Sequence, residues 1–331
     1  MRPPFLFIPN QDAGRVLTPE IANRLVEKSF RLLNKAGTQV QMPPKIYLHL
    51  PRGDFRAMPA YASLAEGAAC GIKWISVFPD NARKKLPTVI GTLLLNDPKT
   101  GKLLAVIEAD TLTALRTGAA GAVASKQLAR RESSTLSLAG AGRQALYQLL
   151  CHLSFFQFRK VFVWSPDPGE ITSFIKRNSK LCLVLEGERD LKRCVEEADI
   201  LCTCTPSRKP LIDASWVGEG THINAIGADA PGKQELDEKL LLKSSIFVDD
   251  WNQASHSGEI NVPFSKGALS KSDIKDTLTH ALINNYRRKP REITLFDSTG
   301  LAIQDMVVAD YIYKQILINI KGRRTSKVSR E

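Results

Sequence analysis

The second part of the chain alternates short β-rich runs with segments of helical periodicity, and this alternation restricts the fold more than any other feature. From about Ser134, the β-rich runs are TLSLAG, KVFVWS, KLCLVL, ADILCTCT, THINAIG, SIFVDD and EITLFDS. Helical segments lie between them, among them RQALYQLLCHLSF, DLKRCVEEA and QELDEKLLLKS, with apolar residues three or four positions apart. Strands that alternate with helices form a parallel sheet with helices on its faces. The sequence therefore predicts an α/β fold with a doubly wound parallel sheet.

The part of the chain before these runs follows a different pattern. KIYLHL, DFRAMPAYAS, GIKWISVFP and PTVIGTLLLND indicate strands joined by Gly, Pro and Asn turns, and a helix is predicted through TALRTGAAGAVASKQLA. After Gly300, LAIQDMVVADYIYKQILINI again has a helical period. With 331 residues, of which 43% are hydrophobic, the chain is long enough for two domains. We expect a smaller α+β domain from 1–125 and 302–322, a domain with the parallel sheet at 126–301, and a disordered basic tail at 323–331.

The composition limits the classes of function. The formal net charge is +12, but dense basic runs occur only at 286–291 and in the tail, without interleaved aromatic residues, so we do not expect nucleic-acid binding. No apolar run approaches the roughly 20 residues of a membrane span, and the N-terminal apolar stretch is too short for a signal peptide. We expect a cytoplasmic protein. The six cysteines lack the paired spacing of a zinc site, which favours buried thiols and no metal.

A glycine-rich turn, GAGRQA at 140–145, follows a β-rich run and opens a helical segment. In a dinucleotide-binding turn, Gly140 permits the tight bend, Gly142 lets a diphosphate approach the backbone, and Ala145 allows the helix to pack closely. The backbone amides at the start of the helix then face the diphosphate. The position of this turn predicts a Rossmann-type sheet that binds NAD or NADP.

The end of the next β-rich run bears on the choice of cofactor. In many dinucleotide-binding domains an acidic residue there binds the adenosine ribose. This chain has Ser165, and Asp167 is the nearest carboxylate. Ser165 carries no charge that would repel a 2′-phosphate, and no arginine follows immediately to attract one. We therefore favour NAD, with NADP left open.

Four cations of the first domain occur among apolar or small residues: Lys45, Arg56, Lys73 and Arg116. Surface charges are not expected in such surroundings. Several converging cations would bind a carboxylate, and Arg116 would do so in bidentate geometry. The alternative for each is a side chain that lays its apolar stem along an exposed strand while its charge stays in solvent.

Asp229 is the candidate for proton transfer in the second domain. It lies in the loop of NAIGADAPGKQELD directly after a β-rich run, hence at the carboxyl edge of the predicted sheet, where ligands bind. A carboxylate in that place can act as a general acid or base. The alternative is a helix cap or an Asx-turn before Pro231.

Separated blocks along nearly the whole chain resemble, in order, the ornithine cyclodeaminase/mu-crystallin family. The blocks are QMPPKIYL, DFRAMPAY, GIKWIS, LPTVIGTLLLND, ALRTGAAGAVASKQLAR, TPSRKPLI, EGTHINAIGADAPGKQELD, VDDWNQASHSGEIN and ITLFDSTGLAIQDMVVA. Within the family they are most similar to the archaeal alanine dehydrogenases. The resemblance implies a homodimer whose substrate and dimerisation domain is interrupted by an inserted Rossmann domain. It also implies NAD(P)-dependent oxidative deamination of a small L-amino acid, with L-alanine converted reversibly to pyruvate and ammonia.

The resemblance also implies roles for individual residues. The substrate carboxylate would lie among Lys45, Lys73 and Arg116 with Arg56 close by, Asp229 would face the amine carbon, and Lys73 would join it in catalysis. The residues implied in cofactor binding are Thr117, Gly118, Gly140, Gly142, Arg143, Gln144, Ser165, Thr205, Ser207, Ala225, Ile226, Gly227 and Ser298. His222 and Glu259 lie in family-like blocks too, but we expect them to be structural.

Other functions share the same fold and stay open. An ornithine cyclodeaminase needs an acidic group for the second amine of ornithine. The family pattern has Glu two residues before Met-Pro, where this chain has Arg56, whose charge would repel that amine. A ketimine or imine reductase remains possible, because hydride transfer to a C=N bond is the reverse half of the same chemistry. A non-catalytic, crystallin-like NAD(P)H-binding protein would keep the nucleotide site without needing Asp229.

Overall fold

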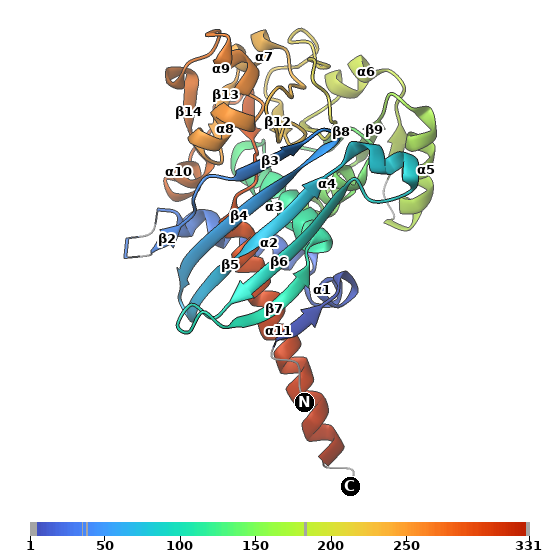
Figure 1. Cartoon of the computed structure of the whole chain (residues 1–331). Coiled ribbons are helices and arrows are strands. Elements are labelled where there is room, and N and C mark those ends of the chain that lie inside the picture. The colour runs from blue at the N-terminus through green and yellow to red at the C-terminus, as the bar shows by residue number, and fades with distance from the viewer. Residues whose placement is uncertain (1–4, 35, 38, 182–183, 329–331) are drawn as a thin grey trace. The chain divides into compact units, whose positions relative to one another are not determined.

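The computed structural model describes residues 5–34, 36–37, 39–181 and 184–328 (Figure 1). The chain forms two compact units, a first unit of Met1–Arg116 with Leu301–Glu331 and a second unit of Thr117–Gly300. The predicted α/β fold class is confirmed, because the second unit contains a parallel sheet with helices on its faces. Within the described residues, no helix has both the length and the apolar character needed to cross a membrane.

The first unit is built on a mostly antiparallel sheet. Its strands are β1 (Leu6–Ile8), β2 (Val40–Gln41), β3 (Ile46–Leu50), β4 (Gly53–Leu64), β5 (Gly67–Val77), β6 (Val89–Asn96) and β7 (Leu103–Glu108). They lie in the order β1-β7-β6-β5-β4-β2, and β3 also pairs with β4. The pair β1–β7 is parallel and the others are antiparallel. Figure 1 shows the long strands β4, β5 and β6 side by side.

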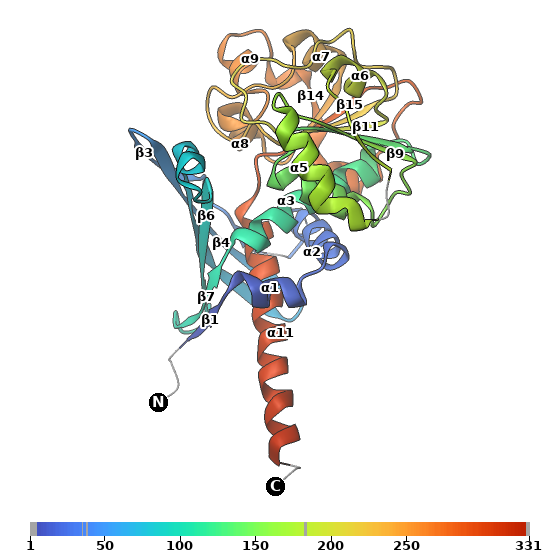
Figure 2. The same cartoon turned by 90° about the vertical axis from the view of Figure 1, so that its right-hand side faces the viewer.

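Helices cover one face of this sheet. α2 (Pro19–Leu32) and α11 (Ala302–Val328) pack against each other, and α11 packs on β4, β5 and β6. α1 (Asn10–Val16) and the start of α3 (Asp110–Leu128) belong to the same unit. Figure 2 shows α1, α2 and α11 on the same side of the sheet. Along β6, Leu93 and Leu95 are buried whereas Ile90 and Leu94 are exposed, which is the alternation expected of a sheet with one covered face.

The second unit contains a parallel sheet. Its strands are β8 (Thr135–Ala139), β9 (Lys160–Trp164), β10 (Leu185–Gly187), β11 (Ile200–Thr203), β12 (His222–Ala225), β13 (Ser245–Val248), β14 (Ile274–Thr277) and β15 (Thr294–Asp297). Their order is β10-β9-β8-β11-β12-β15-β13-β14. The chain runs outward from β8 to β10 and then returns to β11, so the strand order reverses between β8 and β11. Ligands of such sheets bind outside the carboxyl ends of the strands at this reversal.

Helices pack on both faces of the parallel sheet. They are α4 (Arg143–His152), α5 (Pro168–Asn178), α6 (Leu191–Glu196), α7 (Glu238–Lys243), α8 (Trp251–Ser257), α9 (Asn261–Ser265) and α10 (Leu278–Ile283). Side chains of β9 alternate between two cores: Val161 and Val163 belong to the core that includes α4 and α5, whereas Phe162 belongs to the core with α6 and α7. The doubly wound arrangement follows from this alternation, because each face of a strand needs its own apolar cover.

Two expected strand and boundary positions differ from the structure. The run KLCLVL was expected as a strand, but the strand of this region is β10 at Leu185–Gly187, and residues 182–183 lie outside the described residues. The expected boundary at 125/126 differs from the division of the units at 116/117, inside α3. The second half of α3 belongs to the second unit because it packs on α4. A Cβ at Gly118 would lie 2.3 Å from the backbone carbonyl oxygen of Tyr147 in α4, so this approach requires glycine. A Cβ at Gly121 would overlap the side-chain amide of Gln148.

The basic tail also differs from the expectation of disorder at 323–331. α11 continues to Val328, and residues 329–331 lie outside the described residues. No proline or glycine interrupts the chain between 323 and 328. A helix that is already formed gains one backbone hydrogen bond for each residue added, so it continues until a stop signal is reached.

Candidate active site

The glycine-rich turn has the geometry predicted from its sequence. Gly140 has φ of +123°, a conformation that side-chain-bearing residues rarely adopt, and a Cβ there would lie 2.9 Å from the carbonyl oxygen of Cys204. Gly142 is the N-cap of α4, and apart from its chain neighbours no heavy atom of the described residues lies within 4 Å of the position that a Cβ would take there. Arg143 is exposed and stacks over Tyr147. The first turn of α4 therefore presents its backbone amides at the carboxyl end of β8.

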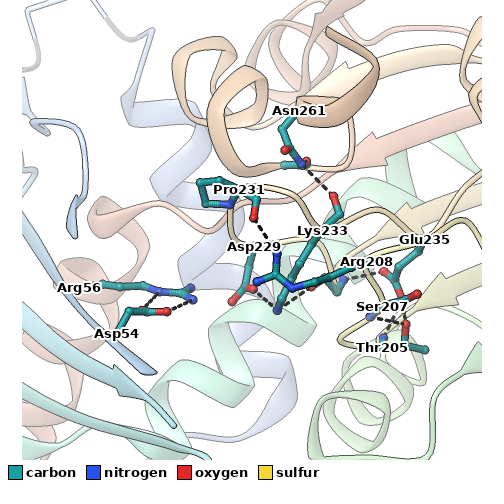
Figure 3. A network of polar contacts seen from close by, with 12 residues as sticks. Asp54, Arg56, Thr205, Ser207, Arg208, Asp229, Pro231, Lys233, Glu235 and Asn261 are labelled. Carbon is teal, nitrogen blue, oxygen red and sulfur yellow. Dashed lines mark hydrogen bonds and ion pairs between the residues drawn. The ribbon is translucent and has the colours of Figure 1, made fainter. Parts of the chain in front are cut away.

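A buried carboxylate organises the neighbouring strand ends. Glu235 accepts hydrogen bonds from the Thr203 hydroxyl at 2.7 Å, from both the amide and the hydroxyl of Thr205 at 2.7 Å, and from the Gly227 amide at 3.0 Å (Figure 3). Glu235 is 1% exposed, and burial raises the pKa of its carboxyl. These donors come from the ends of β11 and β12, so one side chain fixes both loops. Ala225, the last residue of β12, and Ile226 directly precede Gly227 and are buried.

Two further buried carboxylates, those of Glu259 and Asp297, also accept hydrogen bonds from backbone amides. Glu259 accepts from the backbone amides of Glu235, at 2.9 and 3.1 Å, and of Leu236, at 2.7 Å. Asp297, at the end of β15, accepts from the amides of Glu259 at 2.9 Å and Ile260 at 3.1 Å. Burial and the nearby charge of Glu235 raise the pKa of Glu259 well above its usual range. Glu259 therefore holds backbone in place, in keeping with the structural role expected for it.

Asp229 lies in the loop after β12 and forms an ion pair. Its Oδ1 is 2.6 Å from Lys233 Nζ, and Lys233 Nζ also donates to the carbonyl oxygen of Gly227 at 3.4 Å (Figure 3). The side chain of Asp229 is 37% exposed. Asn261 holds the same loop through a bond from its Nδ2 to the Lys233 carbonyl oxygen at 2.8 Å. Asp229 is thus a partly solvated carboxylate on a loop that Lys233 and Asn261 hold in place.

The remaining predicted cofactor residues fall into two groups. Ser298 is buried after β15, and its Oγ and the Nε2 of Gln144 are buried without a hydrogen-bond partner among the described residues. Ser207 instead donates to the carbonyl oxygen of Lys209, and the Thr117 carbonyl oxygen accepts from Gln148 Nε2 at 3.2 Å. Gly118 is buried against α4, so helix packing is the reason for this glycine.

An acidic residue that the sequence did not single out lies close to the end of β9. Ser165 Oγ donates to Glu170 Oε2 at 2.6 Å, and Glu170 lies in the first turn of α5. Asp167 is the N-cap of the same helix and accepts from the Gly169 amide at 2.8 Å. The carboxylate nearest to Ser165 is therefore that of Glu170, whereas Asp167 is engaged as a cap.

In the first unit, two of the predicted cations share one buried carboxylate. Lys73 Nζ of β5 lies 2.8 Å from Asp305 Oδ1 and 2.7 Å from Oδ2, and Arg116 Nε of α3 lies 2.9 Å from Oδ1. Lys73 and Asp305 are 0% exposed and Arg116 is 6% exposed. Burial, and then the charge of Arg116, lower the pKa of Lys73 to about 7, although Asp305 opposes this shift.

The other two cations belong to the same unit. Arg56 is buried on β4, where its Nε lies 2.7 Å from Asp54 Oδ1 and its guanidinium stacks over Tyr47. Lys45, just before β3, is near enough for its charge to act on Lys73. Register places Arg56 and Lys73 on the face of the sheet that the helices cover. Asp54 therefore compensates part of the charge of Arg56.

Asp305 and Glu235 are candidate site residues that the sequence patterns missed. Asp305 lies within the apolar run LAIQDMVVA, where a charge is as unexpected as the four cations were, and this signal could have found it. Glu235 lies in the polar run GKQELD, which gives no sign of burial. Within the described residues, no three His, Cys, Asp or Glu side chains are grouped so as to hold a metal ion, and no disulfide occurs; Cys182 lies outside them.

Comparisons with known proteins agree with this arrangement. Residues 14–319 match the model of the ornithine cyclodeaminase/mu-crystallin family. The chain is 44% identical to an alanine dehydrogenase of Archaeoglobus fulgidus over 96% of this chain and 97% of that protein. A solved archaeal alanine dehydrogenase dimer with bound NAD superimposes with a TM-score of 0.90, at 42% identity over 95% of this chain and 97% of that one.

A second solved structure is equally similar in fold. It is a Delta(1)-pyrroline-2-carboxylate reductase of Thermococcus litoralis in complex with NADH and L-proline, with a TM-score of 0.91 and 32% identity over 95% of this chain and 98% of that one. Because the family model spans most of the chain and the relatives cover it almost end to end, this protein belongs to the ornithine cyclodeaminase/mu-crystallin family.

Proposed function

We propose that this protein is an NAD-dependent amino-acid dehydrogenase that converts L-alanine reversibly to pyruvate and ammonia. The observation that carries the proposal is the buried cluster in which Lys73 and Arg116 share the single carboxylate of Asp305. When Lys73 is protonated, the two cations and one anion leave one positive charge, which an amino-acid or keto-acid carboxylate would balance. Relatives named as alanine dehydrogenases support the choice of substrate.

The carboxyl ends of the parallel strands in the second unit fit a dinucleotide. Gly142 leaves open space where a diphosphate would approach the amides of α4, and the buried Oγ of Ser298 and Nε2 of Gln144 offer hydrogen bonds that no described residue takes up. NAD, when bound, supplies the acceptor for the hydride that leaves the substrate Cα. Thr205 and Gly227, both held by Glu235, line the strand ends beside it.

NAD is preferred over NADP because of the charge at the end of β9. The carboxylate of Glu170, reached through Ser165, would accept a hydrogen bond from a ribose hydroxyl and would repel a 2′-phosphate. Glu170 would then be the acidic residue that binds the ribose, which the uncharged Ser165 cannot be. Kinetic comparison of NADH with NADPH tests it, since equal kcat/KM values for the two cofactors would exclude it.

The chain's own side chains perform the remaining steps. Lys73 and Arg116 bind the substrate carboxylate, with Lys45 and Arg56 adding positive charge, so that Cα is oriented toward the acceptor. Asp229 removes a proton from the water that attacks the imine carbon, and returns a proton to the leaving ammonia. Because Asp229 is partly solvated and paired with Lys233, it can exchange that proton with solvent.

The proposed oligomer is a homodimer formed through the uncovered face of the antiparallel sheet. Ile46, Leu48, Trp74, Ile90 and Leu94 are between 37% and 57% exposed, and the strand register places them all on one face. A contiguous apolar surface of this kind is typical of a protein interface. The mass measured by light scattering should be that of a dimer, and Trp74→Glu should shift it toward the monomer.

The decisive experiment follows the oxidation of NADH by absorbance in the presence of pyruvate and ammonia. Oxidation that requires both compounds is expected. Asp229→Asn should lower kcat by about 10²-fold or more while the dissociation constant for NADH is unchanged, because only proton transfer is lost. Asp12→Asn, which removes one side of another exposed ion pair, is the matched control and should keep wild-type turnover. Wild-type turnover in Asp229→Asn would exclude this role.

Reduction of a cyclic imine is the second candidate function. The similarity to the reductase solved with NADH and L-proline favours it, because that substrate class carries the same carboxylate next to a C=N bond. Delta(1)-pyrroline-2-carboxylate added in place of pyruvate and ammonia separates the two functions. Consumption of NADH with the cyclic imine alone would assign the reductase activity.

A further inference from the structure

Asp305 occupies a position that packing alone does not explain. It lies in the buried first turns of α11, flanked by Ile303, Met306 and Val307, which are all buried. An ionised carboxylate in such surroundings is strongly unfavourable unless it is paired. Its partners come from two other elements, Lys73 from β5 and Arg116 from α3, which are distant from it in sequence. The carboxylate thus joins three elements of the first unit at one point.

We propose that Asp305 is a positioning residue that holds Lys73 and Arg116 in a fixed geometry and keeps Lys73 charged, so that both side chains can bind a substrate carboxylate. The role toward substrate rests on the function proposed above, whereas the role toward Lys73 and Arg116 does not. Lys73 reaches both oxygens of Asp305, while Arg116 reaches Oδ1 through Nε. Arg116 contacts Asp305 through Nε, so the two terminal nitrogens of its guanidinium can engage a second carboxylate.

The charges around Lys73 determine whether it is protonated. Those that act on it are Arg116 from α3, Lys45 from the segment before β3, and Asp305 from α11. Burial and the two cations favour the neutral amine, and Asp305 is the group that favours the ammonium ion. Without Asp305, the pKa of Lys73 would fall further below its present value of about 7, and Lys73 would be neutral near physiological pH. A neutral Lys73 could no longer attract a carboxylate by its charge.

Asp305→Asn tests this role with little change in side-chain shape, and Asp305→Glu restores the charge. Asp310→Asn is the matched control, because Asp310 lies one and a half turns further along α11 and pairs with Lys314 at 2.8 Å. In full-length protein with lysine labelled with ¹³C at Cε, the Lys73 signal is assigned by its loss in Lys73→Met. We expect its titration midpoint near 7 in the wild type and in Asp310→Asn, and at lower pH in Asp305→Asn.

Kinetics supply the second readout. With NADH and ammonia saturating, Asp305→Asn should raise the KM for pyruvate by about tenfold or more, with Asp305→Glu recovering part of the loss. The dissociation constant for NADH should not change. An unchanged Lys73 titration and an unchanged pyruvate KM in Asp305→Asn would overturn the proposal. If the wild type does not act on pyruvate and ammonia, the proposed function fails, while the Lys73 titration still decides the role of Asp305.

Loss of folding in Asp305→Asn is also interpretable. If the buried amine of Lys73 without its partner causes it, Lys73→Met in the same chain should restore folding, because the unpaired polar group is removed. Recovery of the native circular dichroism spectrum in the double variant supports the proposal. Continued unfolding would mean that Asp305 serves helix packing alone, which overturns it.

Discussion

Acid should destabilise this protein through His152 of α4. The side chain is fully buried, Nδ1 lies 2.7 Å from the carbonyl oxygen of Gln148, and Nε2 lies 2.8 Å from Ser125 Oγ. Because a carbonyl only accepts hydrogen bonds, Nδ1 carries the proton and Nε2 accepts from the Ser125 hydroxyl. Asn224 of β12 in turn donates to Ser125 Oγ at 2.8 Å. This network fits the neutral ring, and burial lowers the pKa of His152 to about 4.

The magnitude follows from the difference between the folded and unfolded pKa values. The unfolded chain binds this proton with a pKa of about 6.5 and the folded chain only near 4, so the stability from His152 is complete above pH of about 6.5 and is lost as the pH falls toward 4. Within that window, each pH unit lowers the free energy of unfolding by about 1.4 kcal/mol. A change from pH of about 6.5 to about 5 should therefore remove about 2 kcal/mol.

Other buried groups also change the free energy of unfolding in this pH range, and acid lowers it through some of them and raises it through others. Burial lowers the pKa of His222 to about 3, so His222 acts in the same direction as His152. Burial raises the pKa of Glu259, whose proton is held more tightly in the folded state, so acid favours folding through that group. The total pH dependence therefore does not isolate His152, and a matched variant is needed.

Urea denaturation of the wild type and of His152→Gln, followed by circular dichroism at several pH values, makes that comparison. The variant should be less stable at neutral pH, but between pH of about 6.5 and about 5 it should lose about 2 kcal/mol less than the wild type. His280→Gln is the control, because it removes a histidine whose side chain is 47% exposed instead of buried. Equal slopes in the wild type and His152→Gln would refute the reasoning.

Three further substitutions separate cofactor binding from stability. Glu235→Gln places an amide group opposite donors that need an acceptor, so the dissociation constant for NADH, measured by calorimetry, should rise by about tenfold or more; a wild-type value would leave Glu235 without a role at the cofactor edge. Gly121→Ala should lower the free energy of unfolding by about 1–3 kcal/mol, because its Cβ would overlap Gln148 Oε1, and wild-type stability would contradict that packing. Gly142→Ala has open space instead and should keep wild-type stability while weakening NADH binding; undiminished binding would place the diphosphate elsewhere.

The parallel sheet could be predicted because most of its strands are short apolar runs between turn residues. KVFVW at β9 is buried from Val161 to Trp164 by two separate cores, and only a run that is apolar on both faces satisfies them. β14 gave no such signal. Its sequence is IKDT at the edge of the sheet, where no residue is fully buried and polar side chains are acceptable. An edge strand of this kind cannot be distinguished from a loop by its hydrophobic pattern.

The candidate site was predictable to the extent that its residues are chemically out of place in their surroundings. Lys73 and Arg116 are cations among apolar residues, and the structure places both within hydrogen-bond distance of one carboxylate. Their common partner could not be inferred from spacing, because Asp305 is 232 positions from Lys73. Glu235 could not be inferred at all, because its burial depends on two loops that close around it.

The buried carboxylates of Glu235 and Asp305 meet different requirements of the proposed reaction. Glu235 accepts from hydroxyl and amide donors, including Thr205 and Gly227, so it fixes the positions of two loops without changing the charge of its partners. Asp305 accepts from two cations, so it also favours the charged form of Lys73. A cofactor that receives a hydride mainly needs position, since a displacement of about 1 Å can cost most of the rate. A carboxylate substrate needs positive charge as well, and an anion shared by two cations leaves one such charge in a fixed place.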